Sequence, residues 1–167
     1  MKKFKTLIFV KSSLITLYLA LTIPIPFYSR SDLKLYALVA FLFGFILIID
    51  ITNDFVLTCD KKISYKASFF SNILGKKNWE ISWKDIKLIK SFPTSQGSKV
   101  HYFISNKDES FLVPQRIDNL KEFVLLVSKK TNLNVNQLSY ISPLWTYKLL
   151  TYLSILMIVG EIFAFFS

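Results

Sequence analysis

The chain has 167 residues, 52% of them hydrophobic and 16% aromatic, and its 21 Lys and Arg residues outnumber its 11 Asp and Glu residues to give a net charge of +10. This length leaves room for one modest domain and a few membrane spans, and the apolar residues are gathered in blocks, which favours lipid rather than a soluble core as their surroundings. The single cysteine, Cys59, excludes an internal disulfide and a cysteine-based zinc site.

The first hydrophobic block predicts a membrane span over about residues 7–27. Its roughly 20 residues, at about 1.5 Å each, match a hydrocarbon layer about 30 Å thick. Three lysines among the first five residues precede it and no small-x-small cleavage site follows, so we expect a retained anchor and not a cleaved signal peptide. Lys11 lies inside this span, either as a side chain that snorkels to the headgroups or as an intramembrane polar contact.

Two further blocks predict spans over residues 33–51 and 149–166. The turn between the first two spans is too short for a domain, so residues 1–53 are predicted to form a transmembrane hairpin. The last span follows a linker over residues 136–148 and contains one acid, Glu161. This side chain is either an intramembrane polar contact or one that reaches the far interface.

The distribution of positive charge predicts the orientation. Residues 52–147 carry 14 Lys and Arg against 8 Asp and Glu, and lysines also precede the first span, whereas the hairpin tip carries only Arg30 and Lys34. Basic residues stay on the cytoplasmic side of a membrane. We therefore expect an integral protein of the bacterial cytoplasmic or thylakoid membrane, with a cytoplasmic amino terminus and middle domain and a carboxyl terminus that faces outward.

Alternating apolar residues predict a strand-rich middle domain over residues 54–135. The alternation breaks at Lys84, and Ile86 and Ile89 then lie three residues apart, as in a single helical turn or a bulge. The predicted strands cover about residues 55–59, 63–65, 79–83, 88–92, 100–104 and 111–113, and residues 72–78 form a polar loop. A helix over about residues 119–130 follows, with Asp118 as its N-cap.

Several strands followed by one helix, with a Trp-x-x-Ile element after the third strand, make this region resemble the bacterial pleckstrin-homology-like domains that are tethered to membrane hairpins. The residues that carry the resemblance are 55–65, 81–86, 111–114 and 117–123. The resemblance implies an antiparallel sheet or barrel capped by one helix, here joined to three transmembrane helices. A weaker similarity is to the photosystem I assembly factor of cyanobacteria and chloroplasts, which has a two-helix anchor before a strand-rich domain but no third span of this kind.

No cluster of residues suited to catalysis is visible in the sequence. Catalytic sites need tunable His, Cys, Asp or Glu groups at repeated spacing, and the carboxylates here are scattered and the four glycines form no phosphate-binding loop. The one histidine, His101, is expected to point away from the apolar face of its strand, where it is either solvated or hydrogen-bonded and has no functional role. We therefore expect no enzyme, no cofactor and no metal, and no nucleic-acid binding, because Trp79 and Trp83 share an apolar face with Ile81.

Basic residues at predicted strand ends are the candidate contacts to lipid headgroups or to a partner protein. If these ends meet at one rim, each charge contributes about 1 kcal/mol near an anionic surface. The candidates are Lys61, Lys62, Lys76, Lys77, Gln115 and Arg116. The leading hypothesis is a non-catalytic binding, scaffolding or assembly factor for a membrane protein complex, and the alternatives are an anionic-lipid-sensing module and a small transport or enzyme subunit. The oligomeric state stays open.

Overall fold

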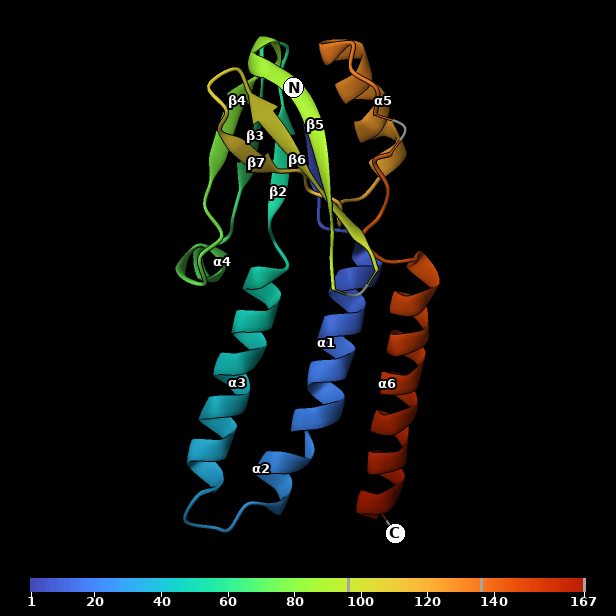
Figure 1. Cartoon of the computed structure of the whole chain (residues 1–167). Coiled ribbons are helices and arrows are strands. Elements are labelled where there is room, and N and C mark those ends of the chain that lie inside the picture. The colour runs from blue at the N-terminus through green and yellow to red at the C-terminus, as the bar shows by residue number, and fades with distance from the viewer. Residues whose placement is uncertain (96, 136, 167) are drawn as a thin grey trace. The chain divides into compact units, whose positions relative to one another are not determined.

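The structure is a computed structural model that describes residues 1–95, 97–135 and 137–166 (Figure 1). It contains α-helices and antiparallel strands. In chain order its elements are β1 (Lys2–Lys5), α1 (Ile8–Thr22), α2 (Pro24–Tyr28), α3 (Lys34–Ile51), β2 (Phe55–Thr58), β3 (Lys62–Lys66), α4 (Phe69–Ile73), β4 (Trp79–Ser82), the 3-10 turn η1 (Trp83–Asp85), β5 (Ile86–Pro93), β6 (Lys99–Ser105), β7 (Ser110–Leu112), α5 (Leu120–Thr131) and α6 (Leu144–Phe166).

The chain divides into two compact units and passes between them three times. Unit 1 contains Met1–Leu7 and Asn53–Pro143, and unit 2 contains Ile8–Thr52 and the segment that begins at Leu144. The sequence predicted a domain over residues 54–135, so the structure extends it at both ends. The main difference is the amino terminus, which was assigned to the transmembrane hairpin and belongs instead to the strand-containing unit.

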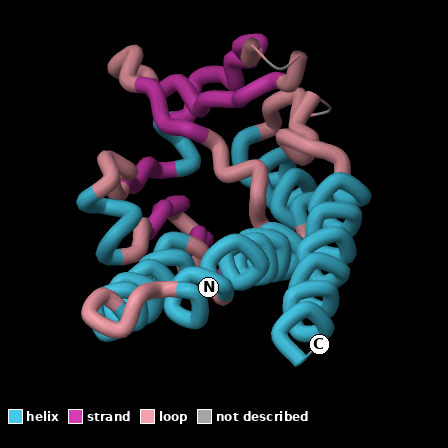
Figure 2. Tube along the Cα trace, turned by 90° about the horizontal axis from the view of Figure 1, so that it is seen from below, coloured by secondary structure: helices cyan, strands magenta, loops and turns pink. Residues whose placement is uncertain are grey.

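Unit 1 contains two antiparallel sheets, which appear as separate groups of strands in Figure 2. Their orders are β1-β2-β3-β4 and β5-β6-β7. Alternate side chains of both sheets point into one core, together with one face of α5, because a sheet buries every second residue. The innermost side chains are those of Phe4, Val56, Ile63, Phe103, Val113, Phe123 and Val127.

The strand β1 is formed by the lysine-rich residues that precede the first span. It pairs antiparallel with β2, with Lys5 opposite Phe55. Its one apolar side chain, Phe4, is buried and meets the ring of Phe123 edge-on, with the ring centroids 5.4 Å apart. The lysines on either side of Phe4 point outward, as the period of two requires. The sequence analysis treated these residues only as charged flanks of a span, because four residues are too few for an alternation to be recognised.

The predicted Trp-x-x-Ile element forms the corner at which the chain leaves the first sheet for the second. Trp83 begins the 3-10 turn η1 and Ile86 begins β5, and both side chains are buried. The indole nitrogen of Trp83 donates a hydrogen bond of 2.8 Å to the carbonyl of Cys59, which satisfies its only polar atom. A register shift between Ile86 and Leu88 follows, so this corner contains both of the irregularities that the spacing suggested, a helical turn and a bulge.

The helix α5 covers the core where the sequence predicted it, but the predicted N-cap is wrong. Asn119 occupies the cap position with a positive φ of 47° and makes no side-chain cap bond. The Asp118 carboxylate instead accepts a hydrogen bond of 2.9 Å from the backbone N–H of Lys5. Strand β1, which the sequence analysis did not foresee, therefore takes the acceptor that would otherwise have capped the helix.

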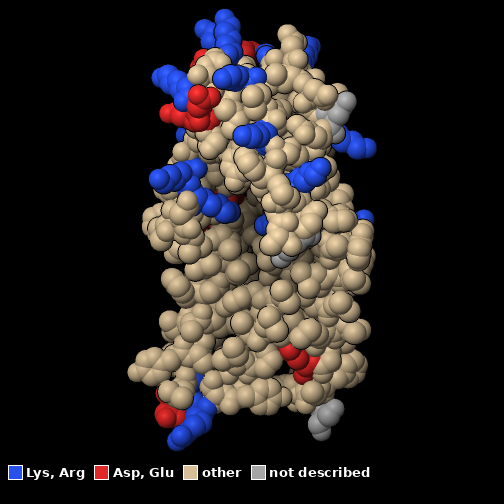
Figure 3. Space-filling view, in the orientation of Figure 1, with Lys and Arg blue, Asp and Glu red and all other residues tan. Residues whose placement is uncertain are grey.

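Unit 2 contains three helical segments that are long and apolar enough to cross a membrane, namely Ile8–Tyr28 (α1 with α2), Lys34–Ile51 (α3) and Leu144–Phe166 (α6). These agree with the three predicted spans, except that α6 begins five residues before the predicted position 149. On the face drawn in Figure 3, charged side chains are gathered on unit 1, and the surface over the helices is almost free of them. An apolar surface of this kind is typical of helices that cross a membrane.

Within unit 2, α1 packs chiefly against α6. The two helices run parallel, because Lys148 lies over the ring of Phe9 at their start, and Phe165 near the end of α6 meets Phe27 of α2, the helix that follows α1. Small side chains allow this close approach, since Ser13, Ala20 and Ser154 are all almost fully buried. The predicted hairpin partner of α1, helix α3, has no buried residue and contacts α1 less extensively.

The contact between α1 and α3 depends on one glycine. The hydroxyl of Tyr18 donates a hydrogen bond of 2.7 Å to the carbonyl of Phe41, and its ring stacks on the ring of that residue. A methyl group at Gly44 would lie 2.5 Å from this hydroxyl. The tyrosine can therefore keep its hydrogen bond only while position 44 has no side chain.

We expect Gly44→Ala to destabilise the full-length protein by about 1–3 kcal/mol, the usual cost of overpacking. The measurement is denaturant unfolding in detergent micelles. Gly160→Ala is the matched control and should change stability by less than about 0.5 kcal/mol, since nothing lies within 4 Å of its added methyl group. In a Tyr18→Phe background, which lacks the hydroxyl, Gly44→Ala should cost less. Equal costs in both backgrounds would contradict the proposed clash.

Candidate functional site

The outer face of the second sheet of unit 1 carries an apolar surface that the sequence analysis assigned to the core. The strand β6 buries His101, Phe103 and Ser105. Its more apolar alternate residues, Val100, Tyr102 and Ile104, therefore lie on the opposite face. The predicted phase of this strand was wrong, because a histidine and a serine were taken as the solvent side.

Neighbouring strands extend this surface. On β5, Leu88 and Phe92 pair with Ile104 and Val100, and on β7, Leu112 pairs with Tyr102. Leu88, Phe92 and Leu112 remain 39%, 43% and 49% exposed. We call this surface the apolar sheet face, and its residues are Leu88, Phe92, Val100, Tyr102, Ile104 and Leu112.

The side chains of the apolar sheet face contact one another, and Lys90 places an ammonium group among them. The rings of Phe92 and Tyr102 meet edge-on with centroids 5.7 Å apart. Lys90 lies opposite Tyr102 in the sheet, and its ammonium group is 5.5 Å from the centroid of the Phe92 ring. A contiguous exposed apolar surface of this kind is typical of an interaction site, whereas isolated exposed apolar residues are not.

His101 is fully buried, so of the two expected states, solvated or hydrogen-bonded, it has the second. Its Nδ1 lies 2.7 Å from the hydroxyl of Ser91, and that hydroxyl donates in turn to Gln137. The serine oxygen therefore accepts a hydrogen bond from Nδ1–H, which fixes the neutral tautomer. Nε2 has no hydrogen-bond partner among the described residues. Burial, and secondarily the charge of Lys99, lower the pKa of His101.

The structure separates the candidate basic residues into two groups. Lys61 and Lys62 lie at the turn between β2 and β3, and the Lys62 ammonium group is 2.7 Å from the carboxylate of Glu80. Lys76 and Lys77 follow α4 at the other end of β3. These four lysines therefore do not meet at one rim of unit 1.

Lys76, Lys77 and Arg116 belong to the end of unit 1 at which the chain crosses to unit 2. Leu7, the last residue before the first crossing, donates its N–H to the carbonyl of Arg116 at 2.8 Å. The hydroxyl of Thr6 donates to the carbonyl of Asp54, one residue after the second crossing. We call this region the junction end. Arg116 is exposed there, so it remains a candidate contact.

Gln115 is a structural residue and not a surface contact. Its side chain is buried, and its amide nitrogen donates to the carbonyls of Lys99 and Ser139, at 3.0 and 2.9 Å. It thereby ties the start of β6 to the segment that leads to the third crossing, after Pro143. The sequence analysis selected Gln115 because it precedes an arginine, and polarity alone did not reveal that it is buried.

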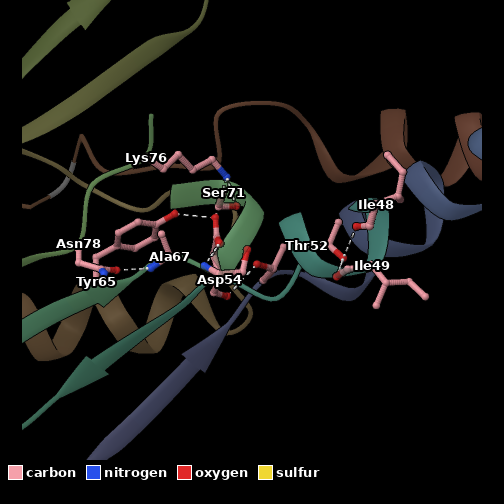
Figure 4. Close-up of polar contacts among 11 residues, drawn as sticks. Ile48, Ile49, Thr52, Asp54, Tyr65, Ala67, Ser71, Lys76 and Asn78 are labelled. Atoms are coloured by element: carbon pink, nitrogen blue, oxygen red, sulfur yellow. Dashed lines mark hydrogen bonds and ion pairs between the residues drawn. The ribbon is translucent and has the colours of Figure 1, made fainter. Parts of the chain in front are cut away.

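Asp54 organises the junction end through a buried carboxylate (Figure 4). One oxygen accepts hydrogen bonds from the Tyr65 hydroxyl and the Lys76 ammonium group, both at 2.6 Å, and the other accepts from the backbone N–H of Ser68 at 2.8 Å. Burial alone would raise the pKa of Asp54, but the hydrogen bonds from Lys76, Ser68 and Tyr65 together lower it below its usual value. The same burial and this carboxylate raise the pKa of Tyr65.

Within the described residues, no group of three or more His, Cys, Asp or Glu side chains is arranged to hold a metal ion. A groove of about 200 Å³ lies between β4 and the turn that joins β6 to β7. Its charged lining consists of Glu80, Asp85, Lys107 and Glu109.

The two candidate intramembrane polar residues lie at different depths in unit 2. Lys11 is half-buried in the first turn of α1, and Glu161 lies near the end of α6. One carboxylate oxygen of Glu161 is buried and has no hydrogen-bond partner in the part of the chain that the structure describes. The helices α1 and α6 run parallel, with Phe9 beside Lys148. Glu161 is 13 residues beyond Lys148 and Lys11 is two residues beyond Phe9, so the two groups lie about 17 Å apart along the axis.

Comparison with known proteins identifies one uncharacterized relative. The chain is 28% identical over 147 residues to an uncharacterized protein of Synechocystis sp., and the match covers 84% of this chain and 74% of that protein. No protein-family model matches the chain. No solved structure matches it either.

We expect Lys76→Met to lower the free energy of unfolding by about 1 kcal/mol, because it removes the ammonium donor from the Asp54 carboxylate and the lysine itself is about half exposed. Lys77→Met is the matched control, since the adjacent lysine is exposed and should contribute less than about 0.5 kcal/mol. Both are measured by urea unfolding of the full chain in detergent. Indistinguishable effects of the two changes would refute the role assigned to Lys76.

Stability should also depend on pH through His101. The unfolded chain binds a proton near pH 6.5, whereas the folded protein resists protonation because the pKa of His101 is lowered. The contribution is therefore complete above pH 6.5 and is lost as the pH falls below it, with a slope of at most about 1.4 kcal/mol per pH unit. His101→Asn keeps a hydrogen-bond donor but does not titrate. Its unfolding free energy should fall less steeply than that of the wild type between pH 6.5 and the onset of carboxylate titration.

Proposed function

We propose that this chain is a non-catalytic, membrane-anchored binding protein that serves as a scaffold or assembly factor for a membrane protein complex. Three helices hold a pleckstrin-homology-like domain at the cytoplasmic surface, and the apolar sheet face of that domain binds the partner. The observation that carries the proposal is the cluster of apolar side chains on the outer face of β5, β6 and β7, of which Leu88, Phe92 and Leu112 are the most exposed.

The membrane anchor is supported by the lengths and composition of α1 with α2, α3 and α6. The pairing of β1 with β2 supports a common side for the amino terminus and the domain, because these strands are the two ends of the hairpin. The lysines of β1 and the net positive charge of residues 52–147 favour the cytoplasmic side.

The pleckstrin-homology-like assignment is supported by the order of elements in unit 1. A four-stranded and a three-stranded antiparallel sheet are followed by one helix that packs into the same core. Trp83 and Ile86, the Trp-x-x-Ile element on which the resemblance partly rests, turn the chain from one sheet into the other. The transmembrane hairpin is an insertion between the first and second strands.

A protein partner accounts for the chemistry of the apolar sheet face. Three side chains that are each 39–49% exposed offer apolar area whose burial is favourable by about 25 cal/mol per Å². An aromatic ring at the centre of such a surface is typical of residues that dominate binding energy. Lys90 beside that ring favours a partner segment that combines apolar side chains with a carboxylate.

Site-specific photo-crosslinking tests the proposal. Benzoylphenylalanine in place of Leu112 should form an adduct with one membrane protein in intact cells. The same probe in place of Leu125 is the matched control, because Leu125 is 70% exposed on α5, away from the apolar sheet face, and it should form no such adduct. Lys90→Glu, which repels a carboxylate, should reduce the yield of the adduct from position 112.

Phe92→Ser should weaken the association with the crosslinked partner by about 1–2 kcal/mol, roughly 5- to 30-fold, whereas Leu125→Ser should not. The readout is co-purification from membranes solubilised in mild detergent. Equal adducts from positions 112 and 125, or an adduct only with a second copy of this chain, would overturn the assignment.

A further inference from the structure

The helix α4 exposes the side chains that a helix on a globular domain normally buries. Phe69, Ile73 and Leu74 are 70%, 66% and 67% exposed, whereas the small polar Ser71 is almost fully buried. A surface helix ordinarily turns its apolar face to the core and its polar face to solvent. The polarity of α4 is inverted, and the medium that meets its outer face must accept large apolar groups.

The inversion is imposed by the Asp54 network and is not a result of poor packing. Ser68, the residue that precedes α4, donates its N–H to the Asp54 carboxylate. Lys76, just beyond the other end of the helix, donates to the same carboxylate. The Lys76 ammonium group also lies 3.5 Å from the Ser71 hydroxyl. Asn78 accepts a hydrogen bond of 2.7 Å from the N–H of Ala67, which closes the base of the segment. Polar contacts hold the inner side of α4, so its apolar side chains are directed outward.

Chain connectivity limits how far α4 can lie from the membrane. Asp54 follows Ile51, the last residue of α3, by three residues, which span at most about 10 Å even when fully extended. The carboxylate of that same residue accepts a hydrogen bond from Ser68, the residue that precedes α4. An interfacial helix buries its apolar face about 5–10 Å into the boundary between headgroups and acyl chains. The tether is thus short enough for α4 to lie in that layer.

We propose that α4 is an interfacial element that inserts Phe69, Ile73 and Leu74 into an anionic lipid surface, at the leaflet in which α3 ends. Lys77, and the part of Lys76 that remains exposed beside its ion pair, contact the anionic headgroups. The segment so combines the two contributions that give stable interfacial binding, buried apolar area and adjacent basic charge. This inference rests on the membrane anchoring proposed above but not on partner binding by the apolar sheet face.

Depth-dependent fluorescence quenching in the full-length chain tests the inference. Cys59 is replaced by serine, and a polarity-sensitive fluorophore is attached at Ile73→Cys or, as the matched control, at Leu125→Cys. The protein is reconstituted at one copy per nanodisc, in phosphatidylcholine with phosphatidylglycerol. The probe at position 73 should be quenched by spin-labelled acyl chains and shielded from aqueous iodide, and the probe at position 125 should behave in the opposite way. Quenching of both probes by iodide alone would overturn the inference.

Lys77→Gln tests the basic contribution without disturbing the Asp54 network. It should reduce the population of lipid-inserted α4 about fivefold in discs that contain phosphatidylglycerol, the effect of one charge near an anionic surface. It should have no effect in discs of phosphatidylcholine alone. An equal effect in both lipids, or none in either, would refute headgroup binding by Lys77.

A second substitution distinguishes this inference from the proposed partner binding. Phe69→Ser with Ile73→Ser should raise iodide access to a probe at Leu74→Cys but leave the crosslink from position 112 intact. Because these side chains are exposed, folding should be retained, and the near-ultraviolet spectrum of the buried Trp83 reports on it. Loss of the crosslink with no change in iodide access would overturn the inference and leave the partner-binding proposal standing.

Discussion

The pairing of β1 with β2 is the constraint on which the rest of unit 1 depends. These strands are neighbours in the sheet but are separated in the chain by the whole of α1, α2 and α3. Phe4 fills the centre of the core from β1, and the N–H groups of Lys5 and Leu7 bind Asp118 and the carbonyl of Arg116. A domain that began at residue 53 would lack the edge strand β1 and the aromatic ring of Phe4 in the core. It would also leave the Asp118 carboxylate and the Arg116 carbonyl without the hydrogen bonds from the N–H groups of Lys5 and Leu7.

Asp54 has a comparable role at the second crossing. A buried carboxylate is costly unless several donors satisfy it, and here a tyrosine, a lysine and a backbone N–H do so. These donors come from β3, from the residues after α4 and from the start of α4 itself. One ionised group therefore fixes the connection between β3 and β4, and it does so directly beside the point at which the chain returns from α3.

The sequence predicted the elements whose signal is local and long. The three spans, six of the seven strands and the α5 helix lie within a few residues of their expected positions, because continuous apolar runs and alternation are read directly from spacing. Strand β1 was missed because a four-residue strand has no readable period and its partner lies beyond α1, α2 and α3. Helix α4 was missed because residues 72–78 were predicted as a loop and residues 69–71 had no assignment, although Phe69 and Ile73 are four residues apart, the spacing of one helix face.

The candidate site was less predictable, because side-chain burial depends on which of two faces a strand turns inward. For β6 the more apolar face was assigned to the core, and the structure buries His101 and Phe103 instead. No local rule reveals such an inversion, since it is decided by α5 and the residues after it, which cover one face and leave the other. Gln115 was misjudged for the same reason, because its acceptors on Lys99 and Ser139 are distant in sequence.

The position of β1 ahead of the hairpin also sets an order of events during synthesis. Residues 2–5 are synthesised before β2 and β3, so they can join the sheet only after residues 55–66 have been made. If the helices of residues 8–51 cross a membrane, both ends of this hairpin must emerge on the same side for β1 to pair with β2. A chain in which only one arm of the hairpin crossed would have a bilayer between β1 and β2, and its apolar core around Val56 would stay incomplete.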